Sequence, residues 1–263
     1  MNPSIGSRVT PLILTFNEEA NIGRTLDSLQ WAARVVVLDS GSLDRTEKIA
    51  RNFNNVDWRT RKFDSFKAQT EYGIRSTDID TDYVMALDAD MVVSKELVNE
   101  IEKEFLISNF TGGSIPFRYC ISGYPLPNSL LSAQLRLFER NKVEIQQVGH
   151  GHKFQVDGSI YRFKSALYHD DRKPIERWVS NQLSYSAAEA ERIIRDDTPS
   201  WRNTIRKCGL APLVIATLAY IRAGGPMGGI AAIRYAYERA LFECLLAIRL
   251  VSNRLERNNT SQK

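Results

Sequence analysis

Three short apolar runs in the first hundred residues each end in a cluster of polar side chains, and no other feature restricts the fold as strongly. The runs cover residues 9–16, 35–38 and 83–87. Strands that are apolar on both faces are typical of a parallel sheet covered by helices. Segments with apolar residues at helical spacing follow each run, so strands and helices alternate along the chain. We therefore predict an α/β fold with a mixed, mainly parallel sheet covered by helices.

The polar clusters lie at the predicted carboxyl ends of the strands. Thr15, Asn17 and Glu18 follow the first run, the stretch Asp39-Ser40-Gly41-Ser42 follows the second, and Asp88-Ala89-Asp90 follows the third. In open α/β sheets, ligands bind outside the carboxyl ends of the strands. We expect the three clusters to meet at one edge of the sheet and to form a site there. Turns and helix caps are the simpler interpretation of Asn17, Glu18 and Asp39.

Asp88 and Asp90 are separated by one residue, a spacing that suits a hard divalent cation such as Mg²⁺ or Mn²⁺. A continuous strand projects alternate residues to one side, so both carboxylates are expected to face one target. A solvated loop with two aspartates is the alternative. The chain contains neither GxGxxG nor GxxxxGK[ST], so the usual phosphate-binding loops are absent. A metal at Asp90 is therefore expected to neutralise a bound diphosphate.

The motifs TFNEEANI, LDSGSLDRT and ALDADM occur in this order. Together they resemble the nucleotide-sugar half of family 2 glycosyltransferases of the GT-A fold, which is Rossmann-like, and most closely the bacterial lipopolysaccharide-core and polysaccharide enzymes. The resemblance covers residues 9–100 well and the remainder loosely, with Leu43 and Met91 as departures. It implies inverting, metal-dependent transfer of a sugar from a nucleotide-sugar, most often UDP-linked, to a cell-envelope glycan or lipid-linked acceptor. The QxxRW motif of processive synthases is absent, which argues against a polymerising synthase.

The same resemblance implies roles for individual residues. The expected donor-binding residues are Thr15, Asn17, Glu18, Asp39, Lys67, Gln69 and Asp88. Asp39 is expected to hold the base, Asp88 the ribose or the metal, and Asp90 the Mn²⁺ or Mg²⁺. An inverting displacement also needs a general base for the acceptor hydroxyl. The stretch YHDDRKPIERW supplies Asp170, the preferred candidate, and Asp171, while Glu139 is a third and weaker choice. We interpret His150 and His152 as hydrogen-bonded loop residues rather than metal ligands.

Two other functions compete with this hypothesis. A sugar nucleotidyltransferase also uses a Rossmann-like sheet and aspartate-bound Mg²⁺, but it normally carries a Gly-rich loop after its first strand. TFNEEANI, residues 15–22, contains no glycine, and the first glycine after it is Gly23. A non-catalytic, membrane-associated partner that retains the fold is the third hypothesis, and the intact Asp39, Asp88 and Asp90 argue against it.

The last part of the chain differs in composition from the first. We predict a GT-A domain over residues 1–200 and a helical, membrane-associated region over residues 201–263. Residues 210–221 are nearly all apolar but fall short of the roughly 20 residues of a membrane span. An in-plane membrane anchor and a helical subdomain packed on the core or on a second subunit both fit this pattern.

Charge and cysteine content restrict the setting further. The formal net charge of +4 is too small to indicate nucleic-acid binding. The three cysteines are far apart and form no CxxC pair, which indicates a reducing compartment. The amino-terminal segment lacks the pattern of a signal peptide. We expect the protein in the cytoplasm, at the cytoplasmic face of the inner membrane, with peripheral membrane contact.

Overall fold

The computed structural model describes residues 4–148, 151–195 and 200–261 of the 263-residue chain. The chain divides into two compact units. The sheet unit comprises Met1–Pro125 and Leu131–Arg172, and the helical unit comprises Leu126–Leu130 and Lys173–Lys263. Each unit is described separately below.

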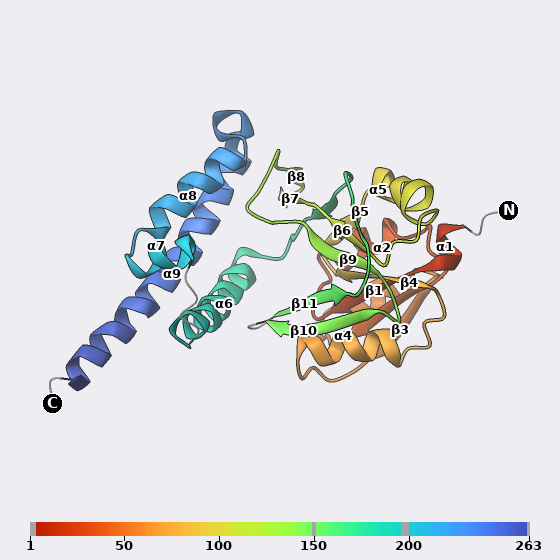
Figure 1. The fold of residues 1–263 in the computed structure, drawn as a ribbon, viewed down its shortest axis with the longest axis horizontal. Helices are drawn as coiled ribbons and strands as arrows, with labels where there is room; N and C mark the ends of the chain where they lie inside the picture. The colour runs from red at the N-terminus through yellow and green to blue at the C-terminus, as the bar shows by residue number, and fades with distance from the viewer. Residues whose placement is uncertain (1–3, 149–150, 196–199, 262–263) are drawn as a thin grey trace. The chain divides into compact units, whose positions relative to one another are not determined.

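A seven-stranded mixed sheet forms the centre of the sheet unit (Figure 1). In spatial order its strands are β12 (Ile160–Arg162), β6 (Gly112–Ile115), β9 (Gln134–Glu139), β4 (Tyr83–Asp88), β1 (Val9–Thr15), β2 (Val35–Asp39) and β3 (Val56–Thr60). Strands β4, β1, β2 and β3 are mutually parallel, β12 is parallel to β6, and only β9 runs antiparallel to its neighbours. The predicted mainly parallel sheet is therefore confirmed.

Apolar side chains cover both faces of the sheet, as the apolar runs indicate. Ile13 packs with helices α1 (Ile5–Arg8), α2 (Ile22–Asp27), α3 (Thr46–Ala50) and α5 (Lys95–Glu100), the last continuing as a π-helix over Ile101–Phe105. Leu12, one residue earlier, faces the opposite side and packs with α4 (Phe66–Arg75) and the hairpin of β10 (Val143–Val148) and β11 (Gly151–Val156). Figure 1 shows α4 on one side of the sheet and α2 and α5 on the other. Because side chains alternate along a strand, one apolar run supplies two cores.

A second, four-stranded sheet joins segments that are distant in the sequence. Its order is β5 (Met91–Val93), β13 (Leu167–His169), β7 (Phe117–Ile121) and β8 (Tyr124–Pro125). Strand β13 is antiparallel to β5, with His169 opposite Met91. Beyond this pair, the backbone N–H of Asp170 donates to the backbone oxygen of Asp90 at 2.9 Å. The small sheet thus brings the Asp88–Asp90 motif next to the predicted general bases.

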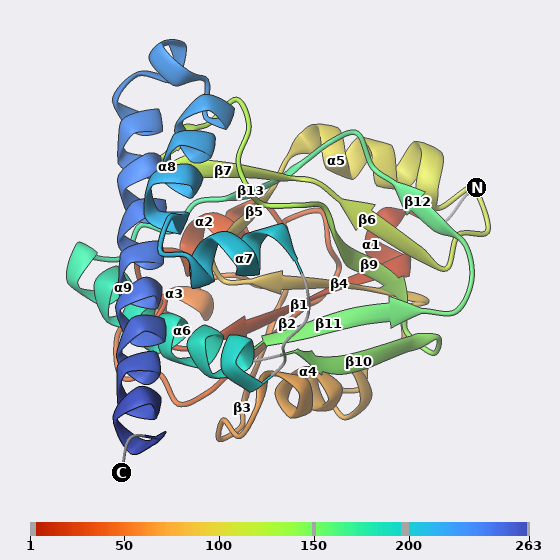
Figure 2. The same cartoon turned by 60° about the vertical axis from the view of Figure 1, so that its left-hand side comes forward.

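The helical unit consists of α6 (Ile175–Arg195), α7 (Trp201–Lys207), α8 (Ala211–Arg222), a 3₁₀ turn at Gly225–Gly228 and the long α9 (Gly229–Ser261). Figure 2 shows α8 lying along α9. Helix α6 packs against α9 through Ala190, Ile193, Leu246 and Leu250. Because of this contact, α6 groups with the helices that follow it. The division after Arg172 therefore precedes the boundary that the sequence predicts after residue 200.

Candidate active site

The carboxyl ends of three parallel strands lie side by side. Strand register pairs Thr15 of β1 with Asp39 of β2, and Leu14 of β1 with Asp88 of β4. The side chains of Thr15 and Asp39 are buried at this edge. We call the edge that carries Thr15, Asp39 and Asp88 the donor edge, after the role that the sequence predicts for it. Thr15 Oγ1 has no hydrogen-bond partner among the described protein atoms. A buried hydroxyl without a hydrogen-bond partner is uncommon, and this one is free to bond a ligand.

Asp39 shapes the turn that follows β2. Its Oδ2 accepts hydrogen bonds from the backbone N–H groups of Gly41 and Ser42, both at 2.8 Å, and its Oδ1 accepts one from Ser42 Oγ. Gly41 has φ of +94°, a conformation that side-chain-bearing residues rarely adopt. A carboxylate offers about four acceptor positions, so Oδ1 retains one. Asp39 can therefore hold its own turn and still accept from an N–H of a ligand.

The loop after β1 is bonded to the loop after β2. Asn17, which has φ of +53°, donates its backbone N–H to Ser42 Oγ at 2.8 Å, and its Oδ1 accepts from the backbone N–H of Leu43 at 2.8 Å. The backbone N–H of Glu18 donates to Thr46 Oγ1 at 2.8 Å. The two loops are thus held as one surface, with Asn17 as its main connector.

The two predicted residues of α4 have different environments. Gln69 is buried, donates to Ser40 Oγ and to the backbone oxygen of Arg61, both at 3.1 Å, and accepts from Arg61. It therefore supports the turn after β2 from behind. The Lys67 side chain is more exposed, with Nζ 3.7 Å from Glu71 Oε1. It lines a surface groove of about 500 Å³ between α4 and β10.

Asp88 and Asp90 do not share one strand. Strand β4 ends at Asp88 and β5 begins at Met91, so a turn separates the two carboxylates and the expected strand alternation does not apply. The Asp88 side chain is 43% exposed, and its Oδ2 lies 3.3 Å from Arg136 Nη2. The Asp90 side chain is only 12% exposed, and its Oδ2 lies 3.9 Å from His169 Nε2.

The carboxylates of Asp88 and Asp90 fit a divalent cation that takes most of its ligands from a substrate. Over residues 4–148, 151–195 and 200–261, no group of three or more His, Cys, Asp and Glu side chains is arranged to hold a metal ion. Mg²⁺ and Mn²⁺ are often bound through one or two carboxylates together with phosphate oxygens. Asp90, with Asp88 nearby, supplies that number of protein ligands, and Arg136 already balances part of the Asp88 charge.

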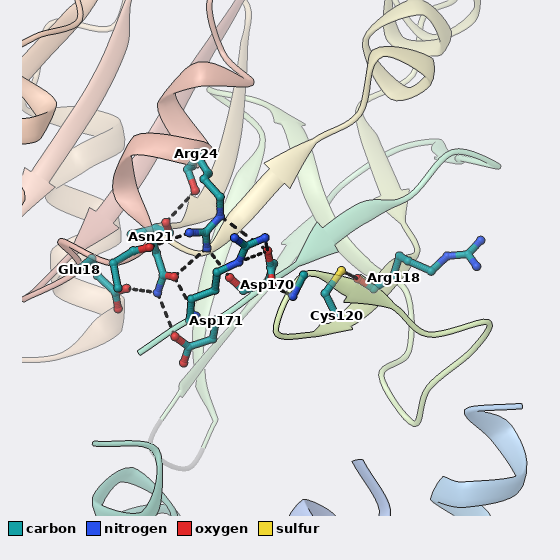
Figure 3. A network of polar contacts seen from close by, with 12 residues as sticks. Glu18, Asn21, Arg24, Arg118, Cys120, Asp170 and Asp171 are labelled. Atoms are coloured by element: carbon teal, nitrogen blue, oxygen red, sulfur yellow. Dashed lines mark hydrogen bonds and ion pairs between the residues drawn. The ribbon is translucent and has the colours of Figure 1, made fainter. Parts of the chain in front are cut away.

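Asp170 lies in a cluster of cationic and amide donors (Figure 3). Its side chain is buried; Oδ1 accepts the backbone N–H of Gly123 at 3.0 Å, and Oδ2 accepts Arg172 Nε at 2.9 Å, with Arg24 Nε 3.6 Å away. Gly123 has φ of +88°, and a Cβ there would lie 2.6 Å from Arg172 Nη2. The turn before β8 must therefore be glycine for Arg172 to reach Asp170. The Asp170 carboxylate therefore stabilises the arrangement of Gly123, Arg172 and Arg24.

Asn21 links the donor edge to Asp171 (Figure 3). Its Nδ2 donates to Glu18 Oε2 at 2.7 Å and to Asp171 Oδ1 at 2.9 Å. Its Oδ1 accepts the backbone N–H of Arg172 and Arg24 Nη2, both at 2.9 Å. All four hydrogen-bonding positions of this buried amide are used. Asn21 thereby fixes the position of the Asp171 carboxylate relative to Glu18.

Arg24 is the cation at the centre of this cluster. Burial and the neighbouring Arg172 guanidinium lower the pKa of Arg24 from its usual value, while Asp170, Asp90 and Asp171 act in the opposite direction. Besides its bond to Asn21, it donates to the backbone oxygens of Ala20 at 2.6 Å and Asp170 at 2.8 Å. Arg24 therefore orders the backbone around the carboxylates.

Other candidates lie elsewhere or were missed. Glu139 stands opposite Tyr83 at the amino end of β4 and bonds Lys142, so it is remote from the donor edge. His150 lies outside the described residues, and the backbone of His152 pairs with Gln147 in the β10–β11 hairpin. The residues that sequence reasoning missed are Asn21, Arg24, Arg136 and His169. Asn21 and His169 carried a signal, because they fall within the motifs TFNEEANI and YHDDRKPIERW.

The sequence model named "Glycosyl transferase family 2" matches residues 12–170, which is more than half of the chain and contains the whole donor edge. The chain belongs to glycosyltransferase family 2. A lipopolysaccharide core biosynthesis glycosyltransferase, LpsC of Rhizobium meliloti, is 23% identical to this family member over 82% of the chain and 88% of its own length. An uncharacterised glycosyltransferase of Rickettsia bellii is 24% identical over 74% of the chain and 70% of its own length.

Solved structures support the GT-A-like fold of this family 2 chain. S. aureus TarS 1–349 in complex with UDP-GlcNAc superposes with a TM-score of 0.51, at 14% identity, over 95% of this chain and 92% of that one. The expected fold class, with a mainly parallel sheet and carboxyl-terminal helices, is therefore confirmed. Family membership selects the glycosyltransferase hypothesis over the nucleotidyltransferase alternative.

Proposed function

We propose that this family 2 glycosyltransferase moves a sugar from a UDP-linked donor to a hydroxyl group of a cell-envelope glycan or lipid-linked acceptor, with inversion at the anomeric carbon. The observation that carries the proposal is the pairing of β13 with β5, which sets the Asp170-Asp171 segment against Asp90. This pairing supports a donor site and a general base at one edge of the sheet. The UDP-GlcNAc bound by TarS and the name of LpsC are consistent with this donor and acceptor.

The donor edge would hold the nucleotide from three sides. Asp39 accepts from the base through its remaining Oδ1 position, and Thr15 Oγ1 gains the partner that it lacks in the free protein. Asn17, Glu18 and Gln69 keep the surrounding loops in place. Asp88 is assigned to the ribose, because Arg136 already occupies its Oδ2. Lys67 would approach the nucleotide from α4.

Asp90 would bind Mn²⁺ or Mg²⁺ together with the diphosphate oxygens of the donor. When bound, such a cation neutralises the negative charge that develops on the departing diphosphate. Asp90 suits this task because its carboxylate is buried and lies at the turn between β4 and β5.

Asp171 is the better general base of the two candidates. Asp170 is buried and bonds Gly123 and Arg172, whereas Asp171 is only half-buried. In the transfer, Asp171 takes the proton of the acceptor hydroxyl while that oxygen forms a bond to the anomeric carbon. The bond from that carbon to the diphosphate oxygen breaks, and UDP leaves with the electron pair. Asn21 orients Asp171 for this step.

A lipid-linked acceptor would place the enzyme at the cytoplasmic face of the inner membrane. The relationship to LpsC supports an envelope glycan as the product class, since that relative is named for lipopolysaccharide core biosynthesis. The +4 net charge gives no support to nucleic acid as a partner.

A nucleotide screen by thermal shift tests the proposal. UDP, GDP, CDP and dTDP are each added with and without Mn²⁺ to the wild type and to Asp90→Ala. A ligand at 100 times its dissociation constant stabilises the folded state by roughly 2.7 kcal/mol. At roughly 2–4 °C per kcal/mol, this raises the unfolding temperature by about 5–11 °C. We expect this rise for UDP with Mn²⁺ in the wild type and its loss in Asp90→Ala.

Asp80→Ala is the matched control, because Asp80 is exposed and precedes β4 at the end opposite Asp90. It should respond to UDP as the wild type does. Failure of all four nucleotides to shift the wild type would remove the donor site and favour the non-catalytic hypothesis. A shift with GDP, CDP or dTDP alone would keep the enzyme class and change the donor.

A further inference from the structure

Helix α8 has an unusual distribution of residue sizes. Its buried positions are Ala211, Ile215 and Ala219, while four other large apolar side chains are exposed: Leu213, Val214, Leu218 and Ile221. Leu213 is 74% exposed and Ile221 is 62% exposed. A soluble amphipathic helix turns its large apolar residues inward and its polar residues outward. Helix α8 is apolar on both sides, and a contiguous exposed apolar surface of this kind marks an interaction site.

The exposed apolar surface continues over the turn between α8 and α9. Met227 in the 3₁₀ turn is 95% exposed, and Ile230 at the start of α9 is 86% exposed. Gly224 and Gly229, with φ of +102° and +59°, let the chain reverse here. Residues 223–233 carry no charged side chain. The end of this helical hairpin is therefore an uncharged apolar projection, which we call the hairpin tip (residues 223–233).

Basic residues flank the hairpin tip without acidic ones. Residues 198–237 contain five Lys and Arg and no Asp or Glu. Arg202 and Arg222 are exposed, and the Arg202 guanidinium lies over the Trp201 ring, 5.4 Å from its centroid. Residues 173–263 carry 14 Lys and Arg against 8 Asp and Glu, whereas residues 1–172 carry 21 against 23. The net positive charge of the chain therefore lies in residues 173–263, which also carry the apolar surface. Of the basic residues near the hairpin tip, Arg206 is paired with Glu189 and Glu243, and Arg234 with Glu238.

Length decides how such a surface meets a bilayer. Helix α8 has 12 residues and is therefore about 18 Å long, well below the roughly 30 Å of the hydrocarbon core. Within the described ranges no single helix has the length and hydropathy of a membrane span. The pair formed by residues 211–222 and 225–257 has a sufficient length and composition only when taken together, and it is bent by 72°. An orientation in the plane of the interface suits α8 better.

We propose that the outer face of α8 and the hairpin tip dock on an anionic lipid surface, with the tip in the acyl boundary and Arg202 and Arg222 at the headgroups. The combination of an apolar face with a basic border is what binds such surfaces. This surface goes beyond the proposed function, because it concerns where the enzyme binds rather than what it transfers. Docking would hold the enzyme on a membrane that carries a lipid-linked acceptor.

Vesicle flotation of the full chain tests the proposal. Vesicles of phosphatidylcholine alone are compared with an equimolar mixture of phosphatidylcholine and phosphatidylglycerol, each at low and high salt. We expect the wild type to float with the mixed vesicles, less so at high salt. The double variant Met227→Glu/Ile230→Glu should no longer float with the mixed vesicles at either salt concentration. Replacing Arg202 and Arg222 by glutamine should weaken binding roughly thirtyfold, from about 1 kcal/mol per basic residue near the surface.

Ile107→Glu serves as the control, since Ile107 is exposed on the sheet unit. It should float as the wild type does. Absence of wild-type flotation, or wild-type flotation by the hairpin-tip variant, would overturn the proposal. A wild-type dimer that does not float, but that the tip variant converts to monomer, would overturn it in favour of a second copy as the occupant. The UDP thermal shift is measured in all variants, so that loss of lipid binding is told apart from loss of the donor site.

Discussion

Replacing Asp170 and Asp171 by asparagine, one at a time, distinguishes a structural carboxylate from a catalytic one. Asp170→Asn keeps an oxygen that can accept the Gly123 N–H but removes the charge that faces Arg24 and Arg172. A hydrogen bond to a charged group contributes roughly 1.5–3 kcal/mol. The Arg172 side chain is more than a third exposed, so solvent screening favours the low end. We expect a loss of about 2 kcal/mol of folding free energy, or roughly 4–8 °C in unfolding temperature.

Asp171→Asn should behave in the opposite way. The replacement retains an oxygen for the Asn21 N–H, so the free energy of unfolding should change by less than about 1 kcal/mol. Loss of a general base lowers the rate by roughly 10²–10⁴. The assay is UDP release from the UDP-sugar in the presence of an envelope lipid extract, paired with thermal unfolding. Asp80→Asn is the control for both measurements.

The reasoning is refuted by one pattern of results. If Asp171→Asn turns over at the wild-type rate, while Asp170→Asn loses activity a hundredfold at an unchanged unfolding temperature, then Asp170 is the base. The ion pairs around it would then be an arrangement of the free enzyme that the acceptor rearranges.

Three further predictions concern stability. Thr15→Val should leave the free protein as stable or raise its stability by up to about 1 kcal/mol, because a buried hydroxyl without a partner is removed, yet it should weaken UDP binding in calorimetry. Arg206→Ala should destabilise the helical unit by roughly 3–5 kcal/mol in denaturant unfolding, since buried Glu243 loses the guanidinium that lies 2.6 Å from its Oε1; a loss under 1 kcal/mol would contradict this. Burial raises the pKa of Glu100, but hydrogen bonds from the backbone of residues 164–165 outweigh burial and lower the pKa from 4.5. The ionised Glu100 therefore stabilises the fold above its unfolded pKa, and this contribution is lost as the pH falls through the lower, folded pKa. In acid unfolding, Glu100→Gln should reduce the decline of the free energy of unfolding below about pH 4.5.

The sequence predicts those parts of the fold that depend on local apolar patterns. The runs at 9–16, 35–38 and 83–87 became β1, β2 and β4, because strands that are apolar on both faces need a covered parallel sheet. It does not predict β5 at Met91–Val93, a three-residue strand that exists only through its pairing with β13. Tertiary pairing over that sequence distance leaves no local pattern.

The same distinction applies to the site. Asp39 and its turn could be placed from the sequence, since the bonds to Gly41 and Ser42 are local. The roles of Asp170 and Asp171 could not be separated, because they depend on Arg24 and Asn21, which lie far away in the sequence. The boundary after residue 172 depends in the same way on the packing of α6 against α9.

Calorimetric titration of UDP, with and without Mn²⁺, tests the donor edge most directly. The wild type is compared with Asp39→Ala and Asp90→Ala, after thermal unfolding has shown that both variants are folded. We predict that Mn²⁺ strengthens UDP binding in the wild type and no longer does so in Asp90→Ala. Asp39→Ala should weaken UDP by roughly tenfold to a hundredfold under both conditions, as expected for a lost hydrogen bond to a charged group. Undiminished Mn²⁺ enhancement in Asp90→Ala, or no UDP binding by the wild type, would contradict the account.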